Sequence, residues 1–474
     1  MSRITIVGGG ISGLAAAHRL ASEHEVIVLE ATDHLGGCLD STTLSGTVAE
    51  GIDLGAEASL HRRPETRELI AELGLDPVHP SREHGSQVLS RGGLRPIPRE
   101  TIMGVPADPD TVADLLGPEA TARVAAEEVT APIAGTDTSV GEFLAARLGD
   151  DLVDTLVDPL LAGVYAGRCR DLSLAATVPA LLPAALDGTS VLDRAATLLV
   201  ARAETAHTDP GGEPAPVFLS LPGGIGALIP ALAEAITAAG GEIRTGSPVT
   251  GLSRAGSGWS VATPDGAIES DTVILATPAY VTADLLAEAA PGPATTLAAV
   301  PYASTALVLA LVDLGDDDLE GSGFLVPPTA DAFIKASTFA SNKWPWMRRR
   351  IPAGTALVRM SVGRFGDAPG TWQDLDDAEL TDRAFADWQA ITGRSGDRIL
   401  TAEVRRWDRA LPQYVPGHLD AVDDLDEEIA GIEGLELVGS AYSGVGIPAC
   451  IGRAHAVADR LMTTDSPDET KEKQ

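Results

Sequence analysis

The chain contains few of the residues that build disulfide-stabilised, metal-binding or hydrolytic sites. Its 474 residues include only 3 cysteines, which lie far apart and form no CxxC pair: Cys38, Cys169 and Cys450. A disulfide framework and a zinc site are therefore not expected, and this cysteine content is typical of a reducing cytosol. The 9 histidines form no HExxH motif, and there is no GxSxG nucleophile motif. These absences argue against zinc-dependent and serine-dependent hydrolases.

Positive charge is scarce. The formal net charge is -34, and lysine occurs only at positions 335, 343, 471 and 473. This charge argues against nucleic acid and against an anionic membrane surface as partners. The acidic runs 316–318 and 423–428 are predicted to be solvated faces, and no metal site is expected.

Long apolar runs are also missing. No uninterrupted run reaches the roughly 18–20 residues of a membrane span, and the stretch that comes closest, Ala303 to Val312, predicts a strand. The first apolar segment begins at Ile4, which leaves no room for a signal peptide, so we expect a cytoplasmic protein without a transmembrane segment. Hydrophobic residues make up 44% of the chain, enough for two or three subdomains. Nothing in the sequence indicates the oligomeric state.

A glycine-rich turn near the N-terminus is the most informative motif present. A strand-like run from Ile4 leads into Gly8-Gly9-Gly10-Ile11-Ser12-Gly13-Leu14, an alanine-rich helix follows, and a second strand ends at Glu30. This order predicts a site for the pyrophosphate of a dinucleotide at a helix N-terminus. We expect Gly8 to allow the tight turn, Gly10 to admit the phosphates and Gly13 to let the helix approach the strand. Glu30 is placed to accept hydrogen bonds from a ribose and to repel a 2′-phosphate.

Further segments suggest that the cofactor site has several parts. The pair Gly36-Gly37 follows Glu30 and predicts a second close approach of the backbone, which a plain NAD fold does not need. A strand at 435–439 leads through a Gly/Ser loop into a helix that starts at Pro448 and runs through Leu461. Its N-terminus would stabilise the anion of a reduced flavin, or it is simply a structural helix cap.

The remaining periodicities predict an α/β chain of three parts. We predict a Rossmann-type FAD-binding domain from 1–75, 218–290 and 400–474, an inserted α+β substrate domain from 76–105 and 291–399, and a helical subdomain at 106–217. Strands are expected at 243–250, 259–262 and 272–275, a helix from Leu221 to Ala239, and mainly strands from Ala303 to Met360.

These motifs also occur together in one protein family. They are the glycine turn, Glu30, Gly36-Gly37, Ala276-Thr277-Pro278 and the run from Gly444 to Pro448. Two more segments are more specific: 159–173, with its Gly163-Val164-Tyr165-Ala166-Gly167 core, and Pro412-Gln413-Tyr414 followed by Gly417-His418. Over nearly its full length the chain resembles the FAD-dependent porphyrinogen oxidases, within the broader monoamine-oxidase-like flavoproteins.

The resemblance implies a set of FAD contacts. Gly8, Gly9, Gly10, Ile11, Ser12, Gly13 and Leu14 would hold the pyrophosphate, Glu30 and Ala31 the ribose, and Val249 the adenine side. Gly37 and Cys38 would contact the cofactor, and Gly55, Ala56, Glu57 and Ala58 would lie near the isoalloxazine. Trp407 would lie near the flavin, with Gly446, Ile447 and Pro448 at its edge. The family usually has Arg or Lys where this chain has Cys38, so a charged contact is missing or replaced. We expect Cys38 to be a small packing residue and the FAD to be bound non-covalently.

The resemblance implies oxidation of coproporphyrinogen III to coproporphyrin III in haem biosynthesis. Six electrons would leave in three flavin cycles, with oxygen as acceptor and hydrogen peroxide as product; no side chain is identified as an acid or base. Protoporphyrinogen IX oxidation, an amine oxidase and a non-enzymatic flavin-containing scaffold are the alternatives. The GVYAG core would line a wide pocket through Gly163 and Tyr165, or it is a tight turn between helices.

Four propionates distinguish coproporphyrinogen from protoporphyrinogen, which has two. Arginine suits carboxylates because its planar fork binds them in pairs. Arg168 and Arg170 directly follow the GVYAG core and Arg95 precedes it, so we predict that these arginines bind substrate, with Arg170 as the best single candidate. The alternative for each is a solvated surface arginine.

Overall fold

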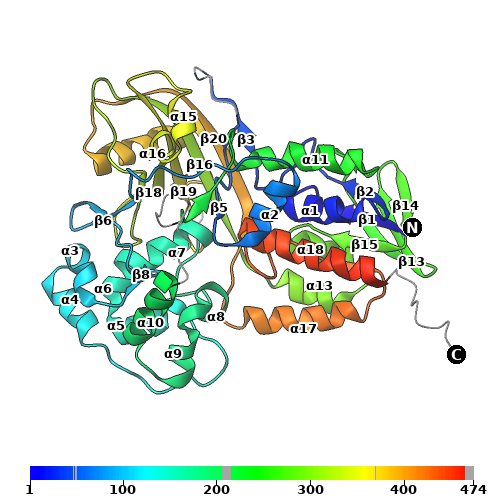
Figure 1. Ribbon diagram of the computed structural model, residues 1–474, viewed down its shortest axis with the longest axis horizontal. Coiled ribbons are helices and arrows are strands. Elements are labelled where there is room, and N and C mark those ends of the chain that lie inside the picture. The colour runs from blue at the N-terminus through cyan, green and yellow to red at the C-terminus, as the bar shows by residue number, and fades with distance from the viewer. Residues whose placement is uncertain (46, 48–50, 205–214, 369, 465–474) are drawn as a thin grey trace.

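The computed structural model describes residues 1–45, 47, 51–204, 215–368 and 370–464. Three parts are visible in Figure 1: a parallel sheet with its helices on the right, a second sheet at the upper left, and a group of helices at the lower left. Long strands of the second sheet run toward the parallel sheet. The N-terminus lies at the far right, in the first part. The arrangement confirms the predicted α/β class.

A five-stranded parallel sheet forms the first part, in the order β11-β2-β1-β15-β21. Its strands are β1 (Arg3–Val7), β2 (Glu25–Leu29), β11 (Glu242–Arg244), β15 (Thr272–Leu275) and β21 (Leu435–Leu437). Strand β1 lies in the middle, with Val7 level with Leu29 of β2 and Leu275 of β15. The glycine turn after Val7 therefore emerges at the carboxyl edge of the sheet, where such folds bind nucleotides.

Alternating side chains bury the two faces of this sheet against different layers. Ile4, Ile6 and Val28 pack on one face against helices α1 (Ile11–Leu20), α2 (Pro64–Glu72), α11 (Leu228–Ala238) and α18 (Ile447–Thr464). Ile27 and Leu29 pack on the other face against a three-stranded sheet and helices. These are β12 (Gly251–Ala255), β13 (Gly258–Thr263), β14 (Gly266–Ser270), α12 (Ala279–Leu286), α13 (Pro291–Ala298) and α17 (His418–Ala430). The result is a layered domain around one central sheet.

A seven-stranded mixed sheet forms the second part, in the order β20-β16-β19-β18-β17-β6-β7. Its strands are β6 (Gln87–Ser90), β7 (Gly93–Pro96), β16 (Tyr302–Asp313), β17 (Gly323–Leu325), β18 (Ile334–Phe339), β19 (Thr355–Val362) and β20 (Arg398–Pro412). One face packs on α16 (Asp377–Thr392) through Val358, Met360 and Trp388. On the opposite face Leu309 and Leu357 pack against Ile52 and Leu54 of the cofactor-side segment. This second face therefore points toward the parallel-sheet domain.

The short elements that join these parts are also defined. Six two-residue strands pair as β3 with β4, β8 with β9 and β10 with β5: β3 (Ser41–Thr42), β4 (Ile52–Asp53), β5 (Ser59–Leu60), β8 (Thr101–Ile102), β9 (Val105–Pro106) and β10 (Phe218–Leu219). Helices α14 (Ala340–Lys343) and α15 (Pro345–Arg348) follow β18, and η4 (Ile225–Ala227) precedes α11.

Helices between residues 109 and 204 form the third part. They are η1 (Pro109–Val112), α3 (Ala113–Leu116), α4 (Pro118–Ala125), α5 (Val140–Leu148), α6 (Asp150–Leu152), η2 (Val153–Val157), α7 (Asp158–Tyr165), α8 (Leu174–Thr177), η3 (Pro179–Leu181), α9 (Leu182–Asp187) and α10 (Val191–Glu204). The predicted helical character is confirmed for these residues, while 205–214 lie outside the described part.

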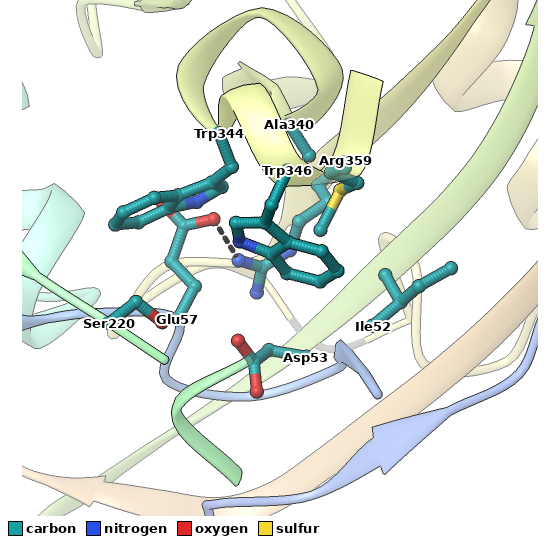
Figure 2. Close-up of a pocket in the computed structure, with 9 residues that line it drawn as sticks. Ile52, Asp53, Glu57, Ser220, Ala340, Trp344, Trp346 and Arg359 are labelled. Carbon is teal, nitrogen blue, oxygen red and sulfur yellow. Dashed lines mark hydrogen bonds and ion pairs between the residues drawn. The ribbon is translucent and has the colours of Figure 1, made fainter. Parts of the chain in front are cut away.

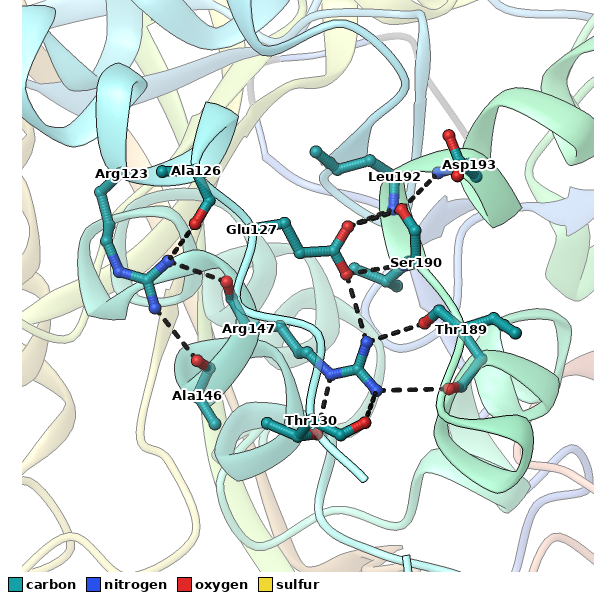
Figure 3. A network of polar contacts seen from close by, with 12 residues as sticks. Arg123, Ala126, Glu127, Thr130, Ala146, Arg147, Thr189, Ser190, Leu192 and Asp193 are labelled. Atoms are coloured by element: carbon teal, nitrogen blue, oxygen red, sulfur yellow. Dashed lines mark hydrogen bonds and ion pairs between the residues drawn. The ribbon is translucent and has the colours of Figure 1, made fainter. Parts of the chain in front are cut away.

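A buried ion pair holds this helical part together (Figure 3). Arg147 of α5 is 0% exposed and reaches Glu127 at 3.3 Å, Thr130 Oγ1 at 2.9 Å and the Thr189 carbonyl at 2.7 Å. Glu127 in turn accepts hydrogen bonds from the Ser190 hydroxyl at 2.6 Å and the Val191 N–H at 2.8 Å. Three segments that together span about 60 residues of the sequence are thus fixed by one polar network.

Several predicted elements differ from those observed. The strand predicted at 243–250 ends at Arg244, because residues 246 and 247 donate to the carbonyls of Thr32 and Glu30 instead of continuing a sheet. The run predicted as strands from Ala303 to Met360 contains α14 and α15. Helix α16 was missed, although Asp376 and Glu379 form a capping box at its start, a signal that sequence alone carries. The domain boundaries given above stay a prediction. No helix within the described ranges is long and apolar enough to cross a membrane.

Candidate functional site

The glycine turn has the geometry that its spacing predicts. Gly8 has a φ of +112°, and a Cβ on Gly13 would lie 2.0 Å from the Gly8 carbonyl oxygen. Gly10, in contrast, has an ordinary extended backbone, and a Cβ there would meet only the Gly36 oxygen, at 4.0 Å. Gly8 and Gly13 are therefore required by the fold itself, whereas Gly10 has open space in front of it.

The N-terminus of α1 presents donors to that space. Gly10 is the N-cap, no side chain caps the helix, and its first turn contains no acidic residue. Ile11, Ser12, Gly13 and Leu14 form this turn, and all four are buried. Uncapped N–H groups and the positive end of the helix dipole make such a terminus an anion site, as predicted for a pyrophosphate.

Glu30 lies beside the turn and orients it. Its carboxylate accepts the Gly9 N–H at 2.8 Å, the Thr32 N–H at 2.8 Å and the Thr32 hydroxyl at 2.9 Å. The segment that leads to Val249 joins this corner, because Ser247 donates its N–H to the Glu30 carbonyl at 2.8 Å. The structure thus brings Glu30, the exposed Ala31 and half-buried Val249 to one edge of the turn.

The second glycine pair lies directly over the first turn. Gly36 donates its N–H to the Gly9 carbonyl at 2.9 Å, and a Cβ on Gly37 would approach Gly10 Cα at 3.5 Å. This confirms the predicted second close approach. Cys38 follows, and its side chain is exposed, so its packing role stays a prediction. Desolvation by the surrounding atoms nevertheless raises the pKa of its thiol.

The segment 54–58 lies next to Cys38 and is held from three sides. Ala56 donates its N–H to the Cys38 carbonyl at 3.1 Å, Trp407 Nε1 donates to the Leu54 carbonyl at 3.0 Å, and Arg359 Nη2 donates to the Gly55 carbonyl at 2.6 Å. A Cβ on Gly55 would lie 2.0 Å from the Cys38 oxygen. The structure therefore brings Gly37, Cys38, Gly55 and Trp407 together, and Ala58 lies half-buried at the end of this segment.

Glu57 is paired with two cations, and Figure 2 shows its contact with one of them, Arg359. Arg359 of β19 contacts its carboxylate at 2.5 Å, and Lys343 at the end of α14 forms a second ion pair. Burial alone would raise the pKa of Glu57, but Lys343 and Arg359 together hold it at about 2. Sequence reasoning missed both cations. The rarity of lysine was the only available signal for Lys343.

Asp53 is a second buried acid close to this pair (Figure 2). It is 4% exposed and accepts the N–H groups of Ile225 and Gly226, each at 3.0 Å. Burial raises the pKa of Asp53 to about 7, against the lowering effect of these bonds and of Arg359. A cavity of about 10 Å³, the size of a single water molecule, lies between Asp53, Glu57, Trp344 and Trp346.

The C-terminal helix returns to the glycine turn. Helix α18 begins at Ile447, one residue before the predicted start, and packs on α1 in a shared core (Figure 1). Gly446 is exposed just before it, while Ile447 and Pro448 are buried. The preceding loop is fixed by Tyr414, whose hydroxyl donates to the Ser440 carbonyl and whose ring stacks on His418 at 4.0 Å. The second specific segment therefore positions the start of α18.

These residues fit a flavin dinucleotide. Four features lie together at one edge of the parallel sheet. They are the uncapped N-terminus of α1, the open space at Gly10, the exposed thiol of Cys38, and the start of α18, which has no acid in its first turn. The pyrophosphate would lie at Gly10 and the isoalloxazine toward Gly55, Trp407 and Gly446. When bound, a flavin would supply a two-electron acceptor to this site.

The GVYAG core belongs to the end of α7. Gly163 is exposed, Tyr165 is buried with its ring 5.7 Å from that of Tyr414, and Ala166 ends the helix at a φ of +49°. The segment then continues as a loop to α8. Ala166 accepts the N–H of Phe365 at 2.7 Å, which joins this turn to the loop after β19.

The three predicted substrate arginines have different surroundings. Arg170 contacts Asp150 at 2.6 Å, Asp154 at 3.1 Å and Glu142 at 3.5 Å, and the bonds to Asp150 raise its pKa further. Arg95 pairs with Asp114 at 2.8 Å. A propionate at either arginine would have to displace acids already in place. Arg168 has a weaker contact, to Asp367 at 3.5 Å. Their roles in substrate binding stay predictions.

Comparison with known proteins agrees with this geometry. The family model described as flavin containing amine oxidoreductase matches residues 11–462. The chain belongs to this family. It is 36% identical to the coproporphyrinogen III oxidase of Mycobacterium tuberculosis and 30% identical to that of Bacillus subtilis, in each case over 97% of this chain and 98% of the relative. The family assignment and the predicted oxidoreductase class are thereby confirmed.

A solved structure shows the same fold. The protein comes from Exiguobacterium sp. 255-15 and carries a provisional assignment as a protoporphyrinogen oxidase. It superposes with a TM-score of 0.83 at 30% identity and covers 98% of this chain and 99% of its own. The family likeness extends over both sheets and the helical part, so a flavin cofactor follows for this chain as a member of a flavin-containing family.

Proposed function

We propose that this flavoprotein oxidises coproporphyrinogen III to coproporphyrin III. The observation that carries the proposal is the end-to-end similarity to coproporphyrinogen III oxidases, 36% over 97% of the chain, in a fold that joins the cofactor edge to the GVYAG turn. The amine oxidase and the non-enzymatic scaffold have no comparable support. Protoporphyrinogen IX oxidation is the second candidate, because the Exiguobacterium relative carries that assignment.

The cofactor is proposed to be FAD, bound without a covalent link. The glycine turn and the uncapped α1 terminus support a dinucleotide, since FMN has no pyrophosphate between two nucleosides. Glu30, already turned toward the Gly9 N–H, supports a ribose on that side. Acid precipitation should release yellow FAD into the supernatant. Flavin that stays with the pellet would show a covalent link.

The chain's own residues would position and shield the reaction. Arg359 and Trp407 hold the carbonyls of Gly55 and Leu54, so the segment beside the isoalloxazine keeps one conformation. Helix α18 would place the positive end of its dipole at the cofactor and favour the reduced, anionic form. We assign no acid or base to a side chain, and molecular oxygen is the proposed electron acceptor.

One assay tests the activity and the substrate. Purified protein with FAD is given coproporphyrinogen III or protoporphyrinogen IX under air, and porphyrin fluorescence and hydrogen peroxide are followed. We expect both signals with coproporphyrinogen III and a higher kcat/KM for it. A higher kcat/KM for protoporphyrinogen IX would overturn the substrate assignment. Porphyrin formed without peroxide would overturn oxygen as acceptor.

A further inference from the structure

Three cations converge where the GVYAG turn meets the mixed sheet. Arg364 follows β19, Lys335 lies in β18, and Arg168 comes directly after the turn. Lys335 is only 8% exposed and donates to the Gly363 carbonyl at 2.6 Å. Arg364 is half-buried and donates from Nη2 to the Val326 carbonyl at 2.7 Å. Such a gathering is unusual in a chain with a net charge of -34.

The acids around these cations do not balance them. Asp367 meets Arg168 at 3.5 Å and otherwise accepts the backbone N–H of Arg364 at 2.7 Å. Asp158 acts on Arg364 only at longer range, because its Oδ1 accepts the Cys169 N–H at 2.7 Å. Arg364 Nε is buried and has no hydrogen-bond partner among the described residues.

The electrostatics of the cluster agree with an excess of positive charge. Burial and the neighbouring Arg168 lower the pKa of Arg364, while Asp367 and Asp158 act in the opposite direction. Burial and Arg364 lower the pKa of Lys335 to about 7, with Asp367 acting in the opposite direction. Buried cations that repel one another are stabilised by an anion placed between them. Arg170, in contrast, has three carboxylates within 3.5 Å.

The position of the cluster suits the substrate. Arg359 of β19 contacts Gly55 and Glu57 at the cofactor side. Gly363, which follows the last residue of β19, is four residues further along the chain. Four extended residues span at most about 13 Å. A tetrapyrrole with one methylene bridge at the flavin carries its propionates at the rim of the ring, at a comparable reach. A Cβ added to the exposed Gly163 of α7 would lie 3.8 Å from the side chain of Leu325, in strand β17 of the mixed sheet, so α7 and this sheet come together here.

We propose that Arg168, Arg364 and Lys335 form a binding site for one propionate carboxylate of the porphyrinogen. The site rests on the proposed function, since it deepens the choice of substrate. Arg364 would supply a half-buried guanidinium, and Arg168 would exchange its 3.5 Å contact with Asp367 for the carboxylate. The buried Lys335 would add positive charge beside them. The carboxylate would occupy the position that Asp367 only partly neutralises.

Two measurements separate this site from the proposed function. Steady-state kinetics give KM and kcat for coproporphyrinogen III. Equilibrium quenching of flavin or porphyrin fluorescence gives the Kd of coproporphyrin III, which has the same carboxylates and needs no turnover. The variants are Arg364→Gln, Arg168→Gln and Arg364→Lys. Arg398→Gln is the matched control, because Arg398 is 75% exposed at the outer strand and pairs only with Asp313 among the contacts described.

We expect Arg364→Gln and Arg168→Gln to raise KM and Kd about tenfold or more, the usual loss for one charge-assisted hydrogen bond. The kcat and the FAD content should change little, and Arg364→Lys should recover part of the affinity. Binding of the tetramethyl ester of coproporphyrin III should not depend on these arginines. If Arg364→Gln does not fold, the partly exposed Arg168 still tests the site.

Other results would overturn the proposal. Unchanged Kd for coproporphyrin III in both Gln variants would remove the cluster from the binding site. An equal loss of ester binding would indicate a structural role instead of carboxylate recognition. If the wild-type protein binds coproporphyrin III tightly but does not oxidise its porphyrinogen, the proposed function fails while the subsite stands. If the wild-type protein binds neither coproporphyrin III nor its porphyrinogen, both the proposed function and the proposed carboxylate site fail.

Discussion

Substitution of Gly10 by valine separates the cofactor site from the fold more sharply than any other change. The Gly10 backbone has φ -76° and ψ 177°, a conformation that valine adopts readily, and a Cβ there meets only the Gly36 oxygen at 4.0 Å. The protein without cofactor should therefore lose only the small preference of an N-cap for glycine, about 1 kcal/mol or less. The side chain would instead fill the space proposed for the pyrophosphate.

The expected loss of cofactor affinity is much larger. Displacing a pyrophosphate from the N-terminus of α1 removes two or more charge-assisted hydrogen bonds, each about 1.5–3 kcal/mol. A loss of about 3 kcal/mol or more corresponds to at least a hundredfold increase in the Kd for FAD. Gly13→Ala is the contrasting variant, because its Cβ would lie 2.0 Å from the Gly8 oxygen and must disturb the turn itself.

The assay is a titration of both apoproteins with FAD, followed by visible absorbance, together with thermal unfolding of the same apoproteins. Gly10→Val should unfold within a few degrees of wild type and bind FAD at least a hundredfold more weakly. Gly13→Ala should unfold at a clearly lower temperature even without FAD. Full FAD occupancy in a folded Gly10→Val protein would show that the dinucleotide lies elsewhere.

Three further changes test the rest of the structure. Arg147→Met leaves buried Glu127 without its guanidinium partner, and should cost about 3–5 kcal/mol and lower the thermal midpoint by several degrees; an unchanged midpoint would mean that the pair adds nothing. Glu57→Gln leaves Lys343 and Arg359 facing each other without a carboxylate, so apoprotein stability and FAD affinity should both fall, as unfolding and flavin titration would show; a loss of neither contradicts the positioning role. Lys335→Met tests linkage to pH: the lysine releases its proton at about 7 when folded and near 10.5 when unfolded, so the unfolded state binds more protons between these values and wild-type stability gains from rising pH there. The variant's stability relative to wild type should therefore be highest below pH 7 and decrease toward pH 10.5, and a difference that does not vary with pH would refute the assignment.

The parts of the site that sequence predicted are those with local causes. The glycine turn and Glu30 lie within a stretch of 23 residues from Gly8, and their spacing alone imposes strand, turn, helix and strand. The second glycine pair and the start of α18 were also found, one residue from its observed beginning. In each case a short run of backbone geometry limits which residues can be present, so the pattern is visible in one dimension.

The extent of several elements was not predictable in this way. The strand at β11 stops at Arg244 because residues 246 and 247 bond to the loop after Glu30, a contact across more than 200 positions. Helices α14 and α15 interrupt a run with strong strand propensity, where Trp344 and Met347 are needed in the core beneath Leu309. Tertiary packing thus outweighed the local preference.

The sequence by itself determined the cofactor class, the family and the edge of the sheet where the site lies, since these depend on backbone requirements that neighbouring residues impose. Only the tertiary structure decided which charges meet. Arg170 proved to be surrounded by acids of α5, α6 and η2, Glu57 found Arg359 some 300 residues away, and Lys335 came to lie beside Arg364 and Arg168. The strength of a charged contact depends on distance and burial, and both are set by strand order and by the packing of whole layers, which residue spacing does not encode.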